Sequence, residues 1–377
     1  MKHPVFLDYN STTPVDYEVL EVMLPFLTDS YGNPSSSHSY GQKALRAIDC
    51  ARMQVSSLLG SNADEIIFTG SGTEANNAAL IGIAFKLKAK GNHIITTQTE
   101  HSSVFNTCRY LESCGFEVTY LGVDSNGIVS PETFENAITD KTILVSIILA
   151  NNETGVIQDI KKLASIAKNK KVIFHADAVQ AAGKIHLDVN GLGVDLLSIS
   201  GHKIYAPKGI GALYIKRGLS LMPVIHGGGQ ERKLRSGTEN VPAIVGFGKA
   251  AELSKLRLTE NSEKLTFLKN SFEEKLIHLI PSAKINGFLS PRVPNTSNIS
   301  FPGCDSELML VKLDLRGICV SSGSACGSAS LEPSRTLKAM NLPDEQQSSA
   351  IRFSFGLQTT LEEIKFTVET LKEIVTN

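Results

Sequence analysis

Residues 143–150 read ILVSIILA, residues 172–179 read VIFHADAV, and residues 196–203 read LLSISGHK. Each run opens with consecutive apolar residues and leads into small or polar ones. Runs that are apolar at nearly every position are typical of strands in a parallel sheet, because helices cover both faces of such a sheet. These three runs therefore predict neighbouring strands with polar residues near their carboxyl ends.

Similar short runs lie on both sides of these three. They read IIFTG at 66–70, HIITT at 93–97, FEVTYLGV at 116–123 and GALYIK at 211–216. Amphipathic stretches that begin near Thr73 and Ser102 separate the earlier runs. Because strands that alternate with helices are typical of α/β architecture, we expect a large domain with a mostly parallel seven-stranded sheet.

The pattern changes after the glycines at 227–229. A long helical stretch from Pro242 to about Ile280 is expected to cross between domains, and beyond it short strands and helices form a smaller α+β pattern. A single core rarely grows beyond roughly 250 to 300 residues, so this chain of 377 residues is expected to form two domains. We assign 14–255 to the large domain, and 1–13 with 256–377 to the small one.

The charge balance argues against several classes of partner. The chain has 37 Lys and Arg against 38 Asp and Glu, and neither sign forms a long block, so no broad field attracts nucleic acid or an anionic membrane. The first ten residues lack the pattern of a signal peptide, and no apolar run approaches the ~20 residues of a membrane span. We therefore expect a soluble, cytoplasmic protein.

The six cysteines are scattered, without a CxxC pair, and no histidines stand at zinc-ligand spacing. This usage favours free, mostly buried thiols in a reducing compartment and indicates no metal site. One exposed thiol with a chemical role is compatible with the same pattern.

Lys203 leaves the run LLSIS for the glycine-rich turn PKGIG at 207–211. A lysine at such a place can form a Schiff base with a carbonyl cofactor, while its small neighbours leave room for a phosphate. Asp177 ends another apolar run, and a buried carboxylate there would suit the protonated nitrogen of a pyridine ring. Taken singly, Lys203 could be a solvated loop lysine and Asp177 a helix N-cap.

Two further motifs follow strands in the same manner. In Gly70-Ser71-Gly72-Thr73, backbone N–H groups and the Thr73 hydroxyl could bind an anion at a helix N-terminus, although ordinary capping is the alternative. In Thr99-Glu100-His101, the imidazole could stack on a planar ring or shuttle protons, although a structural histidine is the alternative.

Ligands of open α/β sheets bind at the carboxyl ends of the strands. Asn152, in the segment NNETG, follows the run ILVSIILA. Five candidates therefore stand at such ends: Thr73, His101, Asn152, Asp177 and Lys203. Their joint placement predicts one shared site.

Two candidates lie in the smaller domain. Cys326 is surrounded by small residues in SSGSACGSAS at 321–330, which suits a nucleophile that must reach both an active site and an outside acceptor; the alternative is a connector with an incidental cysteine. Arg352 stands inside the apolar run AIRFSF. A buried guanidinium needs an anionic partner, which could be a substrate carboxylate or an internal ion pair.

With these motifs in place, the chain resembles the cysteine desulfurases of the NifS/IscS type, which are fold-type I pyridoxal-phosphate (PLP) enzymes of the class-V aminotransferase family. The resemblance runs nearly end to end. It rests on LDYNSTTPVD, GNPSSSH, TEHSSV, NNETGVIQDI, HADAVQAAGK, SGHKIYAPKGIGALY, GGGQERKLRSGTEN, SSGSACGSASLEPS and IRFSFG.

The resemblance implies a role for each candidate in cofactor binding. Lys203 would bond covalently to PLP, Asp177 would pair with the ring nitrogen, Gln180 would contact the ring phenolate oxygen, and His101 would stack on the ring. The remaining cofactor contacts would come from Gly72, Thr73, Asn152, Ser200 and His202 and, across an obligate homodimer, from Thr238 of the other subunit.

The resemblance also implies the reaction. Asn152 and Arg352 would bind the carboxylate of L-cysteine, Lys203 and His101 would move protons, and Cys326 would take the sulfur as a persulfide and leave alanine. The sulfur would then pass to an acceptor protein, either an iron–sulfur scaffold or a tRNA-thiolation relay.

Other functions remain open on the same fold. A selenocysteine lyase or another PLP β-eliminase would work without Cys326, and an aminotransferase has no use for such a thiol. A non-catalytic sulfur carrier or assembly partner would not need Lys203 and Cys326 together, and both are present.

Overall fold

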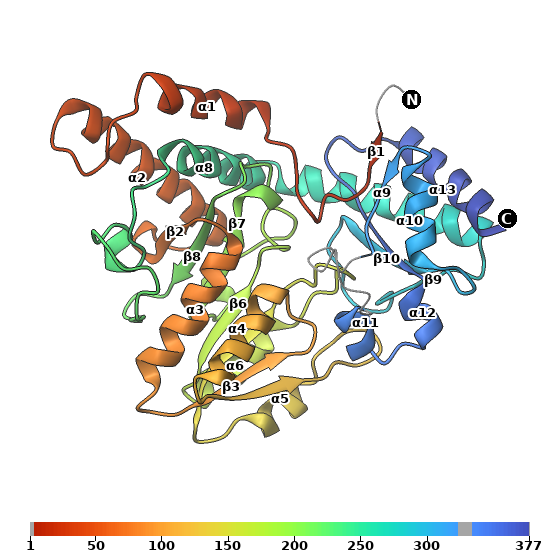
Figure 1. Ribbon diagram of the computed structural model, residues 1–377, viewed down its shortest axis with the longest axis horizontal. Helices are drawn as coiled ribbons and strands as arrows, with labels where there is room; N and C mark the ends of the chain where they lie inside the picture. The colour runs from red at the N-terminus through yellow and green to blue at the C-terminus, as the bar shows by residue number, and fades with distance from the viewer. Residues whose placement is uncertain (1–3, 323–333, 377) are drawn as a thin grey trace.

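The computed structural model describes residues 4–322 and 334–376, so the predicted nucleophile Cys326 lies outside the described residues. A larger α/β part and a smaller α+β part lie beside each other (Figure 1). Helices α8 (Val241–Leu256) and α9 (Leu258–Leu279) lead from the first to the second.

The larger part is built on a seven-stranded sheet in the order β2-β8-β7-β6-β5-β3-β4. Strand β8 runs antiparallel to its neighbours β2 and β7, and the other pairs are parallel. The mostly parallel seven-stranded sheet that the sequence predicted is therefore confirmed. Its strands are β2 (Ile66–Thr69), β3 (His93–Thr97), β4 (Glu117–Leu121), β5 (Thr142–Ile148), β6 (Ile173–Asp177), β7 (Leu196–Ser200) and β8 (Gly211–Ile215).

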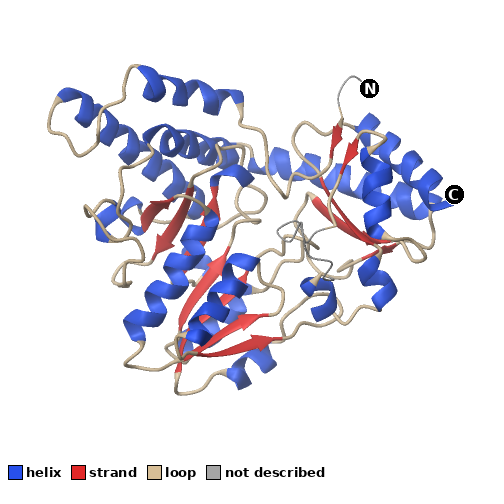
Figure 2. Cartoon of the chain, in the orientation of Figure 1, coloured by secondary structure: helices blue, strands red, loops and turns tan. Residues whose placement is uncertain are grey.

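Helices cover both faces of this sheet (Figure 2). They are α1 (Tyr17–Thr28), α2 (Ser39–Leu59), α3 (Gly72–Leu87), α4 (Ser102–Ser113), α5 (Pro131–Ala137), α6 (Ile160–Asn169), α7 (Val189–Leu192) and α8, with the 3-10 turns η1 (Ala63–Glu65), η2 (Gly201–Lys203) and η3 (Glu231–Lys233).

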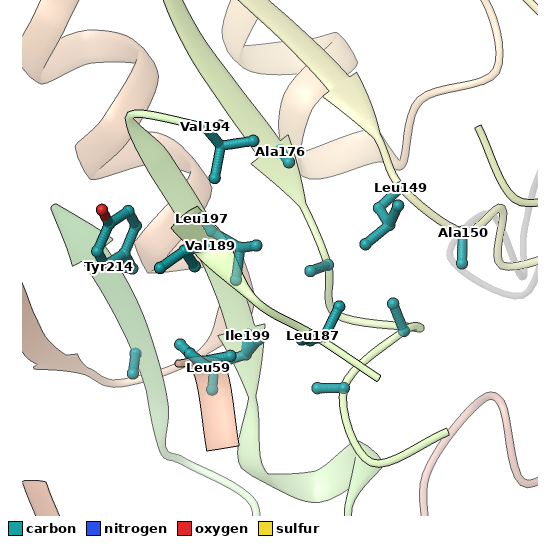
Figure 3. Packing of buried hydrophobic residues seen from close by; sticks show 14 of the residues in the cluster. Leu59, Leu149, Ala150, Ala176, Leu187, Val189, Val194, Leu197, Ile199 and Tyr214 are labelled. Atoms are coloured by element: carbon teal, nitrogen blue, oxygen red, sulfur yellow. The ribbon is translucent and has the colours of Figure 1, made fainter. Parts of the chain in front are cut away.

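The apolar strand runs are explained by this double covering. Successive side chains of a strand point to opposite faces, so Leu144 packs with helices α3 and α4 while Val145 belongs to the cluster on the other face. Figure 3 shows part of that second cluster, where Ile199 of β7 lies beside Leu59 of α2 and Tyr214 of β8 lies beside Leu197 of β7. Both faces are buried, which is why the strands lack polar alternation.

The smaller part has two short sheets and its own apolar cluster around Phe272 and Phe353. In one sheet, β10 (Thr296–Ser300) pairs antiparallel with β9 (Lys284–Ile285) and β12 (Ala350–Ser354), and in the other β1 (Val5–Phe6) pairs parallel with β11 (Ile318–Cys319). Its further helices are α10 (Ser306–Asp314), α11 (Arg335–Ala339), α12 (Asp344–Ser348) and α13 (Leu361–Thr376). Val5 of β1 packs in the apolar cluster of the smaller part, and the domain boundaries remain our proposal.

The helical stretch expected from Pro242 to Ile280 consists of two helices that meet at Arg257. The Arg257 guanidinium contacts Glu18 of α1 at 2.6 Å, and its backbone leaves the helical region there. Among the described residues, no helix combines the length and the apolar character that crossing a membrane requires.

Candidate functional site

The carboxyl ends of β5, β6 and β7 lie at the junction of the two parts, because the residues that follow them, Asn152, Gln180 and Lys203, all contact Asn10. Lys203 lies in η2, directly after β7. Its Nζ atom donates to the backbone oxygens of Asn10, at 2.5 Å, and Ser11, at 2.7 Å. Since Asn10 and Ser11 follow β1 of the smaller part, the strand-end lysine lies where the two parts meet.

Asp177, at the end of β6, is 2% exposed. Its carboxylate accepts hydrogen bonds from Asn76 Nδ2 at 2.7 Å and from the backbone N–H of Val179 at 3.0 Å. Both donors are neutral, and no ion pair of Asp177 exists in the described part of the chain. A buried anion with only neutral donors is well suited to a cationic ligand group.

His101 caps the N-terminus of α4. Its Nδ1 atom accepts from the backbone N–H of Ser103 at 3.1 Å and contacts the Ser103 hydroxyl at 2.8 Å. Because a backbone N–H can only donate, Nδ1 carries no proton, and a neutral ring holds its proton on Nε2. Asn76 Nδ2 also donates to the Ser103 hydroxyl, at 2.8 Å.

Gly72 opens α3 at a point of close approach. A Cβ atom there would lie 2.8 Å from Val179 Cγ2 and 3.1 Å from Ser200 Cβ, so a larger residue would crowd the end of β7. The Ser200 hydroxyl is buried and has no hydrogen-bond partner among the described residues. A helix N-terminus beside an unsatisfied buried hydroxyl is suited to an anion such as a phosphate.

We call the start of α3 at Gly72 together with the Ser200 hydroxyl the anion cradle. Two other predicted phosphate ligands, Thr73 and His202, lie close to these residues in the sequence. Thr73 is exposed on the first turn of α3. His202 contacts Thr12 Oγ1 at 3.2 Å through Nδ1, and burial together with the nearby charge of Lys203 lowers its pKa to about 4. The His202 ring is therefore neutral at neutral pH and keeps one N–H to donate.

Arg352 of β12 is 2% exposed and forms an internal ion pair, which was the alternative left open by the sequence. Its guanidinium contacts Asp8 Oδ1 at 2.6 Å and donates to the backbone oxygen of Asn152 at 3.0 Å. Its Nε atom has no partner in the described part of the chain. Arg352 and Asn152 therefore do lie together, while one donor of the arginine remains unsatisfied.

Gln180 shares a hydrogen-bond acceptor with Lys203, whereas Thr238 shares none with it in the described part of the chain. The Gln180 side chain donates to the backbone oxygen of Asn10 at 2.9 Å, so it lies beside the lysine. Thr238 is exposed on the segment after η3, which the ion pair of Arg235 with Glu74 holds against α3. Among the described residues, Thr238 makes no hydrogen bond to the other site residues.

The sequence reasoning missed four buried polar residues in and around the site: Asn10, Asn76, Glu100 and Lys184. Asn10 and Lys184 belong to motifs quoted for the family resemblance, LDYNSTTPVD and HADAVQAAGK. The available signal was that both are polar members of motifs already singled out for other residues. Three of them have partners far away in the chain, 286 positions for Asn10, 101 for Asn76 and 174 for Lys184, which no local pattern reveals.

The residues present fit PLP. An amine at a strand end can bond to its aldehyde, a buried carboxylate can hold its protonated ring nitrogen, and the start of α3 with Ser200 can hold its phosphate. The Ser200 hydroxyl is buried without a partner among the described residues, and the Asp177 carboxylate has only neutral donors, so both are suited to groups of the cofactor.

Comparison with known proteins points the same way. The family model described as Aminotransferase class-V matches residues 5–366. The chain is 49% identical over 375 residues to a protein named cysteine desulfurase IscS from Dictyoglomus turgidum, an alignment that covers all of this chain and 95% of the relative.

Two solved structures are similar over most of the chain. One is titled NifS-like protein, with a TM-score of 0.92, 39% identity and 99% of each chain covered. The other is titled SspA in complex with cysteine, with a TM-score of 0.84 and 39% identity, and covers 93% of this chain and 98% of that one. These similarities confirm the family resemblance and the fold predicted from the motifs.

Proposed function

The chain belongs to the class-V aminotransferase family of PLP-dependent enzymes, and within it we propose that this protein is a cysteine desulfurase. It would convert L-cysteine to L-alanine and transfer the sulfur to its own Cys326. The observation that carries this proposal is the Lys203 amine directly after β7, beside the strand β6 that ends in the buried Asp177 and three residues after Ser200, which adjoins the start of α3.

PLP, when bound, supplies an aldehyde that bonds to amines and a pyridine ring that draws electrons from the substrate Cα atom. Asp177 would hold the ring nitrogen in its protonated form, because the carboxylate is buried with neutral donors only. Gly72, Thr73, Ser200 and His202 would hold the phosphate, and the His101 ring would cover one face of the cofactor.

Protons would be moved by two groups of this chain. The Lys203 amine, once released from the cofactor, would accept the proton from the substrate Cα atom. The neutral His101 ring already carries its proton on Nε2, so it can accept a further proton only at Nδ1, which forms imidazolium and gives up the hydrogen bond from the Ser103 N–H. It is our candidate to assist the ionisation of an incoming thiol, since an unperturbed thiol has a pKa near ~8.5 and is mostly protonated at neutral pH.

The sulfur transfer balances without an outside reductant. The Cβ–S bond of cysteine breaks, a new S–S bond forms with Cys326, and a C–H bond replaces the lost C–S bond in alanine. The carbon is thereby reduced and the sulfur oxidised by the same two electrons. Asn152 and Arg352 would hold the substrate carboxylate. The Arg352 guanidinium would then donate hydrogen bonds to both Asp8 and the substrate.

We further propose a homodimer, with Thr238 reaching the phosphate in the other subunit. Helix α1 supports this proposal, because Tyr17, Leu20, Leu24 and Leu27 form an exposed apolar stripe at helical spacing. Thr238 itself is exposed, as a residue that contacts another subunit would be in a single chain. The sulfur acceptor would be an iron–sulfur scaffold or a sulfur relay for tRNA thiolation.

The proposal is tested by the absorption spectrum of the purified protein before and after addition of cysteine, with alanine and sulfide quantified. The wild type should show a visible band of lysine-linked PLP and should form alanine from cysteine. Lys203→Ala should lose both. The control Lys216→Ala, which removes an exposed lysine paired with Asp195, should lose neither. A colourless wild type, or a Lys203→Ala variant with an unaltered band, would overturn the proposal.

A further inference from the structure

Lys184 is a buried lysine that has no part in the proposed reaction. It lies in the turns after β6, four residues beyond Gln180, and is 7% exposed. Its Nζ atom donates to Gln180 Oε1 at 2.7 Å and to Asn10 Oδ1 at 3.1 Å. Both acceptors are neutral amide oxygens, and no ion pair of Lys184 exists in the described part of the chain. Burying an amine without a charged partner costs free energy of folding, so its presence here calls for a role beyond packing.

The surroundings favour the uncharged amine. Burial, the charge of Lys203 and the charge of Arg352 lower the Lys184 pKa well below its usual value, in that order. Among the carboxylates near the strand ends, Asp8 already pairs with Arg352, while Asp177 and Glu100 accept hydrogen bonds from neutral donors. A neutral amine keeps two N–H groups, which match the two amide oxygens, so the contacts do not depend on a charge.

The Gln180 amide is held at both ends, and the contacts with Lys184 and with the Asn10 backbone oxygen favour the same orientation. With its oxygen held by Lys184, the amide directs its NH₂ group to the backbone oxygen of Asn10, at 2.9 Å. The same backbone oxygen accepts from Lys203 at 2.5 Å. The donor end of Gln180 and the Lys203 amine therefore converge on one oxygen atom. A flipped amide would place an acceptor there instead.

Asn10 is held in place by both parts of the chain. Its Oδ1 atom accepts from Lys184 and, at 3.1 Å, from Asn295, while its Nδ2 atom donates to Thr296 Oγ1 at 2.8 Å. Lys184 thus contacts the two residues that meet at the acceptor of the Lys203 amine, Gln180 from the larger part and Asn10 from the smaller. Substitution of Lys184 would leave both amide oxygens without this donor.

We propose that Lys184 is a positioning residue that fixes the orientation of the Gln180 amide, so that an N–H group rather than an oxygen faces the lysine-linked cofactor. The inference rests on the proposed function, because it assigns Gln180 to the phenolate oxygen of PLP. An N–H donor stabilises the ionised phenolate, whereas an amide oxygen would favour its protonated form. The pH at which the visible band changes therefore reports the orientation, independently of turnover.

The test is a pH titration of the visible absorption in Lys184→Met, which keeps the length of the side chain and removes the donor. The midpoint of the absorbance change should rise by about 0.5 pH unit or more, and kcat/KM for cysteine should fall by about 10-fold. The matched control is Lys269→Met. Lys269 is also buried, at 6% exposed, and donates to the backbone oxygen of Val293 in the smaller part. That variant should change the midpoint by less than about 0.2 unit.

A double-mutant cycle separates positioning from simple removal of a nearby amine. In a Gln180→Ala background, Lys184→Met should add little further shift, because the amide through which Lys184 acts is gone. An equal shift in both backgrounds would overturn the inference, as would an unshifted midpoint in Lys184→Met with PLP bound. Lys184→Gln, which offers an amide N–H, should restore part of the wild-type midpoint.

Loss of PLP is also informative. A band that is absent in Lys184→Met and present in Lys184→Gln supports the role as a donor. A band absent in both, while Lys269→Met keeps it, counts against positioning through a hydrogen bond. A colourless wild type would instead overturn the proposed function, and with it this inference.

Discussion

Asn76 Nδ2 donates to the buried Asp177 carboxylate at 2.7 Å and to the Ser103 hydroxyl at 2.8 Å. The Ser103 hydroxyl in turn contacts His101 Nδ1 at 2.8 Å. One amide on α3 therefore connects the residue proposed to hold the ring nitrogen with the residue proposed to cover the ring face. Because α3 also begins at the anion cradle, a single helix organises three sides of the proposed cofactor site.

We expect Asn76→Ala to weaken PLP binding by about 10-fold or more, because a hydrogen bond to a charged group contributes roughly 1.5–3 kcal/mol. The visible band should remain at saturating PLP, since Lys203 is untouched. The measurement is a titration of apoprotein with PLP followed by absorbance. Asn77→Ala is the matched control, because Asn77 donates to the backbone oxygen of Thr73 in its own helix. Equal affinity in the two variants would contradict the role given to Asn76.

Gly72→Ala should lower the affinity for the phosphate of the cofactor. The added Cβ atom would lie 2.8 Å from Val179 Cγ2, which pushes the start of α3 away from Ser200. Wild-type protein should prefer PLP over pyridoxal, which lacks the phosphate, and the variant should lose about 10-fold or more of that preference. Gly122→Ala is the control, since a Cβ atom there meets no atom within 4 Å. An unchanged preference in Gly72→Ala would argue against the cradle.

The sequence predicted the strands of the large sheet and the polar residues at their ends because both are local signals. Continuous apolar runs such as 143–150 indicate a strand that is buried on both faces of the sheet. The residues that follow such a run lie at the carboxyl edge of the sheet, because the strands are parallel. Asp177 and Lys203 could therefore be placed at one edge before any contact was known.

The contacts around those residues could not be predicted, because they join distant segments. Asn10 and Lys184 are 174 positions apart, and Asp8 and Arg352 are 344 apart. The division of the long helical stretch at Arg257 has the same origin. Arginine is not a helix-breaking residue, and its side chain contacts Glu18 of α1, which is far away in the sequence. Tertiary partners decide these features, and a single sequence does not record them.

Mixing Thr238→Ala subunits with Lys203→Ala subunits should restore activity. If Thr238 acts across the dimer, each mixed dimer contains one site with both an intact Lys203 and an intact Thr238, while the other site carries both defects. Activity should approach half of the wild-type value per mixed dimer. The assay is alanine formation after refolding or coexpression of differently tagged subunits. Recovery no greater than the sum of the two parent homodimers would place Thr238 in its own subunit's site.

Cys326→Ser should keep the visible band and bind cysteine, yet release sulfide at less than about 1% of the wild-type rate, because a hydroxyl cannot accept the sulfur as a persulfide. Cys50→Ser, which removes an exposed thiol elsewhere, should behave as wild type. Rapid sulfide release by Cys326→Ser, or efficient turnover of selenocysteine, would favour a β-eliminase or selenocysteine lyase on the same fold.

Glu100 makes the stability of the folded protein depend on pH. It is 3% exposed, its Oε1 atom accepts from the backbone N–H of Ile148 at 2.9 Å and from Thr97 Oγ1 at 2.8 Å, and Oε2 has no partner among the described residues. Burial raises the Glu100 pKa to about 8, from 4.5. The folded protein therefore retains a proton that the unfolded chain releases.

The sign of the effect follows from linkage. Between pH 4.5 and about 8 the folded state binds more protons at Glu100 than the unfolded state does, so the stability from this group is fully present below pH 4.5 and is lost as pH rises through about 8. Glu100→Gln does not titrate, and its amide can accept from Ile148 as the acid does. The loss of stability from about pH 5 to about pH 8, measured by urea unfolding, should therefore be smaller in the variant. Other titrating groups are common to both proteins, so the difference between the two slopes isolates Glu100; parallel slopes would mean that this carboxyl is ionised in the fold.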